Sequence, residues 1–165
     1  MSQSPVINIA DVALEDFGGK GMIAARLGRM GPALGAKELG CMLTVTPPGK
    51  AAFPFHNHHA IEELVIVLEG EGELRLGNRT DKLKAGDVVS FPAGEQDAAH
   101  QIVNTGVRDL KYLCVSTMPE TDIVEYPDSG KFRAVHLKRH QLVKDAPFHH
   151  LGRKADEVDF WEGEV

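Results

Sequence analysis

The feature that most limits what this chain can fold into is a regular succession of short strand-like segments after residue 39. Segments rich in β-branched residues alternate with Gly, Pro, Asn and Asp turns at intervals of about 8 to 12 residues, a rhythm typical of all-β domains. The dipeptide Gly77-Asn78 predicts a hairpin, because both residues tolerate the positive φ angles of tight turns. The predicted strands span residues 41–46, 62–68, 72–77, 79–84, 87–91, 99–104, 110–117 and 122–126.

Two segments flank this strand-rich region, and we expect all three parts to form one domain. The chain has 165 residues, 42% of them hydrophobic, which suffices for a single core. Residues 1–38 are glycine-rich with little periodicity, and they predict an extended N-terminal arm with turns. Residues 136–165 are polar and irregular. We expect this C-terminal segment to pack back on the body of the protein through Trp161, since burying an indole ring is favourable.

Charge and composition exclude several classes of partner. The formal net charge is −6 and the basic residues are dispersed, so no basic face for nucleic acid is predicted. The N-terminus lacks the features of a signal peptide, and no apolar run is long enough to cross a bilayer. We therefore expect a cytoplasmic protein without membrane or nucleic-acid partners. Cys41 and Cys114 each lie in an apolar, strand-like context, which favours buried free thiols.

The stretch "HNHHAIEELVIVLEG", residues 56–70, places three histidines and two glutamates directly before an apolar strand. His56 and His58 are two residues apart, so in extended backbone they point the same way and can bind one metal ion, whereas His59 points elsewhere. Glu63 begins the strand and shares the parity of its inward-facing valines, while Glu62 has the solvent-facing parity. The alternative is a polar loop that happens to precede a strand.

The spacing around these residues is specific. Gly49, six residues, His56-x-His58, four residues, Glu63, six residues and Gly70 together resemble the first motif of the cupin superfamily.

The stretch "GDVVSFPAGEQDAAHQIVN", residues 86–104, is similar to the second cupin motif. It contains Gly86, Pro92-x-Gly94, then His100, three residues and Asn104. The resemblance implies a single antiparallel β-barrel of jelly-roll topology over residues 39–135, flanked by the arm and the C-terminal segment. It also implies that one divalent metal ion is bound by His56, His58, Glu63 and His100.

Both motifs depart from the usual cupin pattern. One additional residue separates Gly49 from His56, and three additional residues separate Gly94 from His100. A strict count would put Asp97 in the ligand position, but only His100 keeps the three-residue step to the following asparagine. We therefore expect His100 to be the ligand and residues 95–97 to form an enlarged turn at the mouth of the barrel, with Asp97 as the alternative ligand.

The residues that would contact a substrate are less evident. Gln96 and Asp97 lie on the enlarged turn and are placed for such contact. Arg75 and Tyr112 lie on predicted strands and could reach a phosphate or hydroxyl group, the alternatives being an exposed arginine and a core tyrosine. No residue stands out as a general base.

Three imidazoles and one carboxylate leave coordination positions open on an octahedral ion, as in catalytic sites, and suit Zn, Mn, Fe or Ni. The main hypothesis is a metal-dependent isomerase or epimerase of a small sugar, sugar phosphate or related hydroxy-carbonyl compound. Resemblance to small bacterial cupins provisionally assigned as sugar-phosphate isomerases favours it. The alternatives are an Fe-dependent dioxygenase and a non-enzymatic module that binds a small ligand. The resemblance and the long arm also predict a homodimer.

Overall fold

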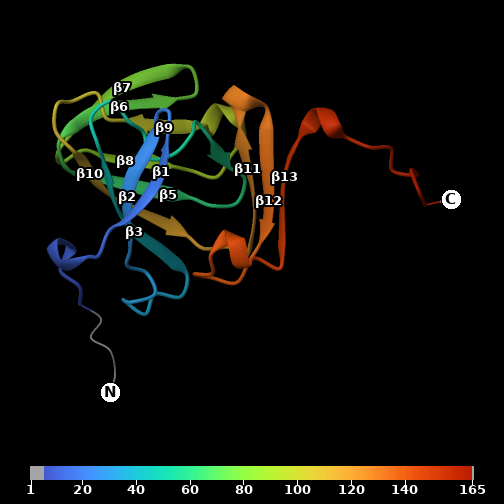
Figure 1. The fold of residues 1–165 in the computed structure, drawn as a ribbon, viewed down its shortest axis with the longest axis horizontal. Coiled ribbons are helices and arrows are strands. Elements are labelled where there is room, and N and C mark those ends of the chain that lie inside the picture. The colour runs from blue at the N-terminus through green and yellow to red at the C-terminus, as the bar shows by residue number, and fades with distance from the viewer. Residues whose placement is uncertain (1–5, 165) are drawn as a thin grey trace.

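The computed structural model describes residues 6–164, and within them the secondary structure consists of strands and short 3-10 turns (Figure 1). The strands are β1 Glu15–Lys20, β2 Ile23–Arg29, β3 Leu39–Thr46, β4 Asn57–His58, β5 Glu63–Glu69, β6 Glu71–Leu76, β7 Arg79–Lys84, β8 Val88–Phe91, β9 His100–Val103, β10 Leu110–Thr117, β11 Thr121–Tyr126, β12 Lys131–His136 and β13 Phe148–Arg153. The 3-10 turns are η1 Ile9–Asp11, η2 Gln96–Ala98, η3 Pro127–Ser129, η4 Val143–Asp145 and η5 Lys154–Asp156.

The strands form three antiparallel sheets that enclose one interior. Their orders are β1-β2-β3-β10-β5-β8, β13-β12-β11-β4 and β7-β6-β9. Every predicted strand is present, as β3 and β5 to β11, with ends displaced by at most two residues. The all-β prediction is confirmed.

The interior follows from the alternation of side chains along the strands. On β5, Val65 and Val67 are 3% and 1% exposed, whereas Leu64, whose side chain lies on the opposite face of the strand, is 37% exposed. The inward-facing residues of β5 to β10 form one apolar cluster: Val65, Val67, Leu74, Leu83, Phe91, Ile102, Leu110 and Tyr112. Glu63, at the first position of β5, has the same parity as the valines and is thereby turned toward the interior.

The N-terminal arm is more regular than the sequence indicates. β1 and β2 form an antiparallel hairpin, and β2 pairs with β3, so the segment extends the large sheet. The hairpin depends on Gly18, which has φ +82°, and a Cβ on it would lie 2.5 Å from the carbonyl oxygen of Ile23. The sequence predicted an extended arm with turns, and the structure adds that residues 15–29 of this arm are paired in the sheet.

The C-terminal segment also differs from expectation. β12 and β13 continue the sheet from β11, so residues 131–153 are regular. Beyond η5 the chain leads away from the barrel (Figure 1). Trp161 is 62% exposed and its aromatic contact is with the adjacent Phe160 ring, 4.8 Å away between centroids. The expectation that Trp161 packs on the body is wrong, because the acidic residues around it keep this stretch hydrated.

Both cysteines are free and partly buried, in agreement with their apolar strand context. Within residues 6–164, no helix has the length and hydrophobicity that crossing a lipid bilayer requires.

Candidate metal centre

Three of the four side chains predicted as metal ligands, those of His56, His58 and Glu63, form a cluster that could hold a metal ion, and His100 adjoins it. Ligand atoms of His56, His58 and Glu63 all lie within 4.8 Å of one another. His100 Nε2 lies 3.1 Å from Glu63 Oε2, and the His56 and His100 ring centroids are 4.7 Å apart. The cluster is built from the loop before β4, from β4 itself and from the start of β5, and the adjoining His100 comes from the start of β9.

Backbone pairing brings these distant segments together. The His56 amide donates to the His100 carbonyl oxygen at 3.1 Å, and the His100 amide donates to the His56 carbonyl oxygen at 2.8 Å. Residues directly opposite one another in an antiparallel pair project to the same side, so both rings face the interior. His100 is further fixed by Phe91, whose ring lies parallel to the imidazole with centroids 3.8 Å apart.

The three histidines present the same nitrogen to the centre, because the other nitrogen of each ring has its own partner. His56 Nδ1 lies 2.8 Å from the Pro54 carbonyl oxygen, His58 Nδ1 2.6 Å from Asp122 Oδ2, and His100 Nδ1 3.2 Å from the Ala98 carbonyl oxygen. A carbonyl oxygen only accepts, so Nδ1 of the first and third rings carries the proton. Nε2 of each ring is left on the side of the centre, where it can offer a lone pair to a cation in the tautomer that a metal ligand needs.

Asp122 is a residue of this site that the sequence did not indicate. It is 4% exposed, and besides holding the His58 ring it accepts a hydrogen bond from the Ala60 amide at 2.9 Å. It lies on β11, which pairs with β4 through Val124 and His58. A carboxylate behind a ligating imidazole fixes the ring and raises its basicity.

Glu63 is oriented from both sides. Its Oε2 faces the histidines, at 3.1 Å from His100 Nε2 and 3.9 Å from His58 Nε2, while its Oε1 accepts a hydrogen bond from the Cys114 thiol at 3.4 Å. Burial raises the pKa of that thiol well above its usual range, so it stays protonated and can donate. The carboxylate is thus held with one oxygen toward the centre.

The protonation states of His56 and Glu63 favour the binding of a cation. Burial lowers the pKa of His56, and the neighbouring His100 and His58 lower it further, to about 3. Burial alone would raise the pKa of Glu63, but its hydrogen bond to His100 and the charges of the three histidines hold it at about 2. At neutral pH His56 is therefore uncharged and Glu63 is a carboxylate. His100 Nε2 lies 3.1 Å from the Glu63 oxygen, and a cation bound by both atoms would take the place of their hydrogen bond.

The alternative ligand, Asp97, lies outside this cluster. His100 is 6% exposed, whereas Asp97 is exposed on η2. Together with Gln96, Asp97 lines a groove of about 740 Å³ on the outer surface, formed by Phe55, Arg75, Leu76, Gly77, Asn78, Arg79, Gln96, Asp97 and Pro127. The additional residues between Gly94 and His100 are accommodated as η2, so the enlarged turn is a single turn of 3-10 helix.

Arg75 and Tyr112 occupy the positions given for them as alternatives. Leu76 pairs with His100 and faces the interior, so Arg75, one residue earlier, faces outward. Its guanidinium group binds both oxygens of Asp128 at 2.7 and 2.9 Å and lies 3.6 Å from the centroid of the Phe55 ring. Tyr112 is 4% exposed within the apolar cluster, and burial raises its pKa well above its usual range. That Gln96, Asp97, Arg75 or Tyr112 binds a substrate stays a prediction.

The neighbours of the ligands behave as parity predicts. His59 points away from the centre, with Nε2 3.7 Å from a Glu125 oxygen, and Glu62 is exposed.

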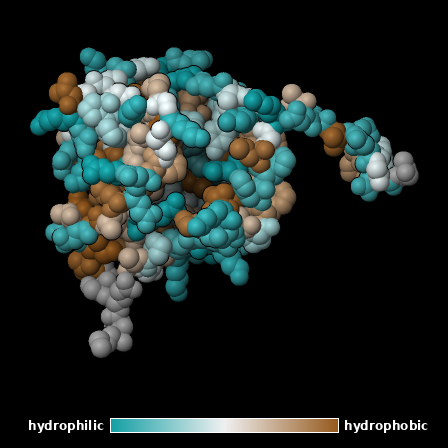
Figure 2. All heavy atoms as spheres, viewed as in Figure 1, coloured by the Kyte–Doolittle hydropathy of each residue, from teal (hydrophilic) through white to brown (hydrophobic). Residues whose placement is uncertain are grey.

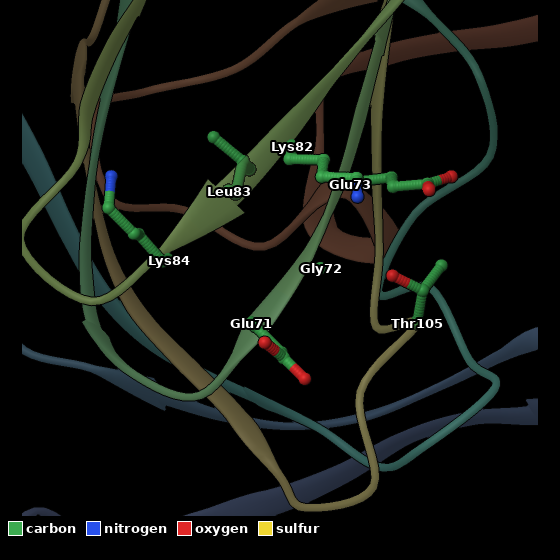
Figure 3. Close-up of a pocket in the computed structure, with 7 residues that line it drawn as sticks. All are labelled: Glu71, Gly72, Glu73, Lys82, Leu83, Lys84 and Thr105. Atoms are coloured by element: carbon green, nitrogen blue, oxygen red, sulfur yellow. The ribbon is translucent and has the colours of Figure 1, made fainter.

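A second hollow, of about 440 Å³, is lined by residues of β6 and β7 and by Thr105 (Figure 3). Glu71 on its wall follows the end of β5 opposite to Glu63, so this hollow lies at the other end of the barrel. Its charged side chains are acidic on β6, at Glu71 and Glu73, and basic on the neighbouring β7, at Lys82 and Lys84. It contributes nothing to the metal centre.

Comparison with known proteins agrees with this geometry. The family model described as "Cupin domain" matches residues 42–116. Auxin-binding protein 1 of Arabidopsis thaliana is 32% identical over 135 residues, which cover 75% of this chain and 65% of its own length. Auxin-binding protein T85 of Nicotiana tabacum is 30% identical over 132 residues, covering 74% of this chain and 68% of its own length.

Among solved structures, a candidate sugar phosphate isomerase from Acidithiobacillus ferrooxidans superposes with a TM-score of 0.79 at 27% identity, over 94% of this chain and 96% of that one. The matched region contains both histidine motifs and the strands that pair them. The chain belongs to the cupin superfamily.

Proposed function

We propose that this protein is a metal-dependent isomerase or epimerase of a small sugar, sugar phosphate or related hydroxy-carbonyl compound. The observation that carries the proposal is the convergence of His56, His58, Glu63 and His100, with Nδ1 of each histidine held by a separate acceptor. Metal binding requires histidine rings held in fixed orientations, and these hydrogen bonds provide that orientation.

The donor set fits a divalent transition metal. Neutral imidazole nitrogen and carboxylate oxygen without thiolate suit Zn, Mn, Fe or Ni, and four protein ligands leave room for two oxygens of a ligand in octahedral geometry. When bound, such an ion would polarise a carbonyl group and stabilise a developing enediolate charge. The chain's own residues orient the ligands: Asp122 binds His58, Cys114 binds Glu63, and the Phe91 ring stacks on one face of His100.

The comparisons support the proposal to different degrees. The similarity to the candidate sugar phosphate isomerase extends over almost the whole of both chains, which favours an activity of that class. The similarity to auxin-binding proteins favours a second function, the binding of a small organic ligand without catalysis. Both functions use the same centre and differ in whether a proton moves.

Elemental analysis of protein purified without chelator tests the first step, and we expect about one transition-metal ion per chain. Incubation of the metal-loaded protein with aldoses, ketoses and their phosphates in D₂O then tests catalysis, because an enediol intermediate exchanges its carbon-bound hydrogen with solvent. Metal-dependent exchange that is lost in His58→Ala would support the isomerase. A ligand that raises the melting temperature without exchange would support the binding function. Oxygen consumption by the iron-loaded protein would instead support a dioxygenase.

A further inference from the structure

The sheet formed by β11, β12 and β13, beside the metal centre, carries a group of side chains that the sequence did not indicate. On β11, Asp122 contacts His58 and the Tyr126 ring stacks near His56, with centroids 6.4 Å apart. Because alternate residues of a strand share a face, the face of β11 with Asp122, Val124 and Tyr126 is the one turned toward the centre.

The register of the sheet extends this face across β12 and β13. Val124 pairs with His58 on one side and with Arg133 on the other, and Tyr126 pairs with Lys131. Lys131 in turn pairs with Arg153 on β13. Directly opposed residues share a face, so Lys131, Arg133 and Arg153 all lie on the side that faces the centre.

This face is basic although the chain as a whole is acidic. The one carboxylate of β11 to β13 on this side is Asp122, which already binds His58 and the Ala60 amide. Lys131 Nζ lies 5.9 Å from the centroid of the Tyr126 ring, and Arg153 donates to the Ser129 carbonyl oxygen. The local excess of positive charge attracts anions to the mouth of the centre.

Arg133 is the residue most in need of a partner. Its Nε is buried and forms no hydrogen bond within residues 6–164, and the arginine ion pairs found there do not include Arg133. A buried donor without an acceptor costs stability, and a guanidinium group binds the two oxygens of a carboxylate or phosphate in parallel. Arg75, the arginine suggested by the sequence, has this need met by Asp128 on the outer face.

We propose that Arg133, with Tyr126 and Lys131, binds the anionic group of a substrate whose oxygens lie at the metal centre. The inference rests on the proposed function, and it narrows the substrate to a small hydroxy-carbonyl compound with a carboxylate or phosphate at its far end. Two strand spacings separate His58 from Arg133, roughly 10 Å between backbones, which suits a molecule of a few carbons.

Three probes that share a 1,2-diol test this: glycerol 3-phosphate, 3,4-dihydroxybutanoate and the neutral butane-1,2-diol. Their affinities for the zinc-loaded protein are measured by titration calorimetry, for the wild type and for Arg133→Gln, Arg133→Lys, Arg75→Gln and Arg26→Gln. Arg26 is the matched control, because it is a half-exposed arginine on β2 that is paired with Asp109, in the loop before β10. Metal content and melting temperature are recorded for each variant.

We expect the wild type to bind at least one anionic probe more tightly than the diol, and the preferred probe identifies the substrate's group as phosphate or carboxylate. Arg133→Gln should weaken that probe at least about tenfold, which corresponds to about 1.4 kcal/mol, and leave the diol unchanged. Arg133→Lys should recover part of the loss, and Arg26→Gln should stay within about threefold of the wild type. An Arg133→Gln affinity within about threefold for both anions, or an equal loss in Arg75→Gln, overturns the proposal.

The metal and the anion site fail separately. If the purified protein binds no transition metal, the proposed function fails, and titration of the metal-free chain with inorganic phosphate still tests Arg133. We expect the same loss of affinity in Arg133→Gln there, and an unchanged phosphate affinity would overturn the anion site alone.

Discussion

Asp122 sets the orientation of His58, and its contribution can be measured. Asp122→Asn preserves the shape of the side chain but replaces a charged acceptor with a neutral amide, so the His58 ring loses its strongest partner. We expect metal affinity to fall about 10- to 100-fold, as is typical for partners of ligating histidines. Competition with a chromogenic chelator measures it. Asp128→Asn is the control, since that aspartate is 56% exposed and binds Arg75, and equal affinities in the two variants would contradict the role given to Asp122.

The titration of His56 and Glu63 predicts how the metal-free protein responds to acid. In the folded state the pKa of His56 is lowered from 6.5 to about 3, so between these values the unfolded chain binds more protons and stability falls as pH falls. The pKa of Glu63 is lowered from 4.5 to about 2, which continues the loss below pH 4.5. Melting temperatures of chelator-treated protein should therefore decrease steadily from about pH 6.5 downward. His56→Gln should flatten the curve between about pH 6.5 and 4.5, and an unchanged slope would argue against it.

The sequence was sufficient to predict four candidate ligands that the fold brings close together, but not the residues around them. His56, His58, Glu63 and His100 carry local spacing, and alternation along a strand decides which of them face inward. Asp122 and Arg133 have no such local signal. They reach the centre because β11 pairs with β4 and β12 pairs with β11. The first pairing joins segments more than sixty residues apart, and the second joins strands on either side of a turn.

The turn at residues 95–97 is the element on which the second motif departs from its family, and it gives the sharpest test of the ligand set. His100→Ala should lower metal content steeply, because its Nε2 lies at the centre. Asp97→Ala should keep the metal, because Asp97 lies in the outer groove. Elemental analysis of both variants decides between them. Metal retained in His100→Ala and lost in Asp97→Ala would reverse the assignment.

Strands were predictable wherever one face of the strand is apolar and the other polar. β5 and β6 show this contrast, and their limits agree with the sequence to within a residue or so. β1 is exposed along its whole length and contains two glycines, so it carries no alternating pattern. β12 was missed for a different reason: the face turned toward the metal centre carries Lys131 and Arg133, so its two faces do not differ clearly in polarity.

At the scale of the whole molecule, the outer face of the large sheet supports the predicted homodimer, which we retain as a proposal. Leu64 pairs with Val115, and Ile66 pairs with both Leu113 and Val88, so these five apolar residues form one continuous patch. Leu64 is 37% and Val88 60% exposed. Figure 2 shows apolar side chains gathered on one flank of the protein. Apolar surface of this extent is typical of an interface.

Val88→Glu tests this patch. A charge at the centre of a dimer interface costs desolvation, so the variant should sediment near the chain mass of 18.0 kDa, whereas the wild type should sediment near twice that mass at micromolar concentration. Val107→Glu is the matched control, because Val107 is 89% exposed and lies in a loop outside the patch. A wild-type protein that sediments as a monomer would exclude the dimer.

The exposed position of Trp161 determines what intrinsic fluorescence can report. It is the only tryptophan of the chain and lies on the C-terminal stretch that leads away from the barrel. Its emission should already resemble that of an indole in water and should change little when the barrel melts, so unfolding is better followed by circular dichroism. For the same reason, a blue shift of the emission would indicate that a binding partner has covered Trp161, because no other tryptophan contributes to the signal.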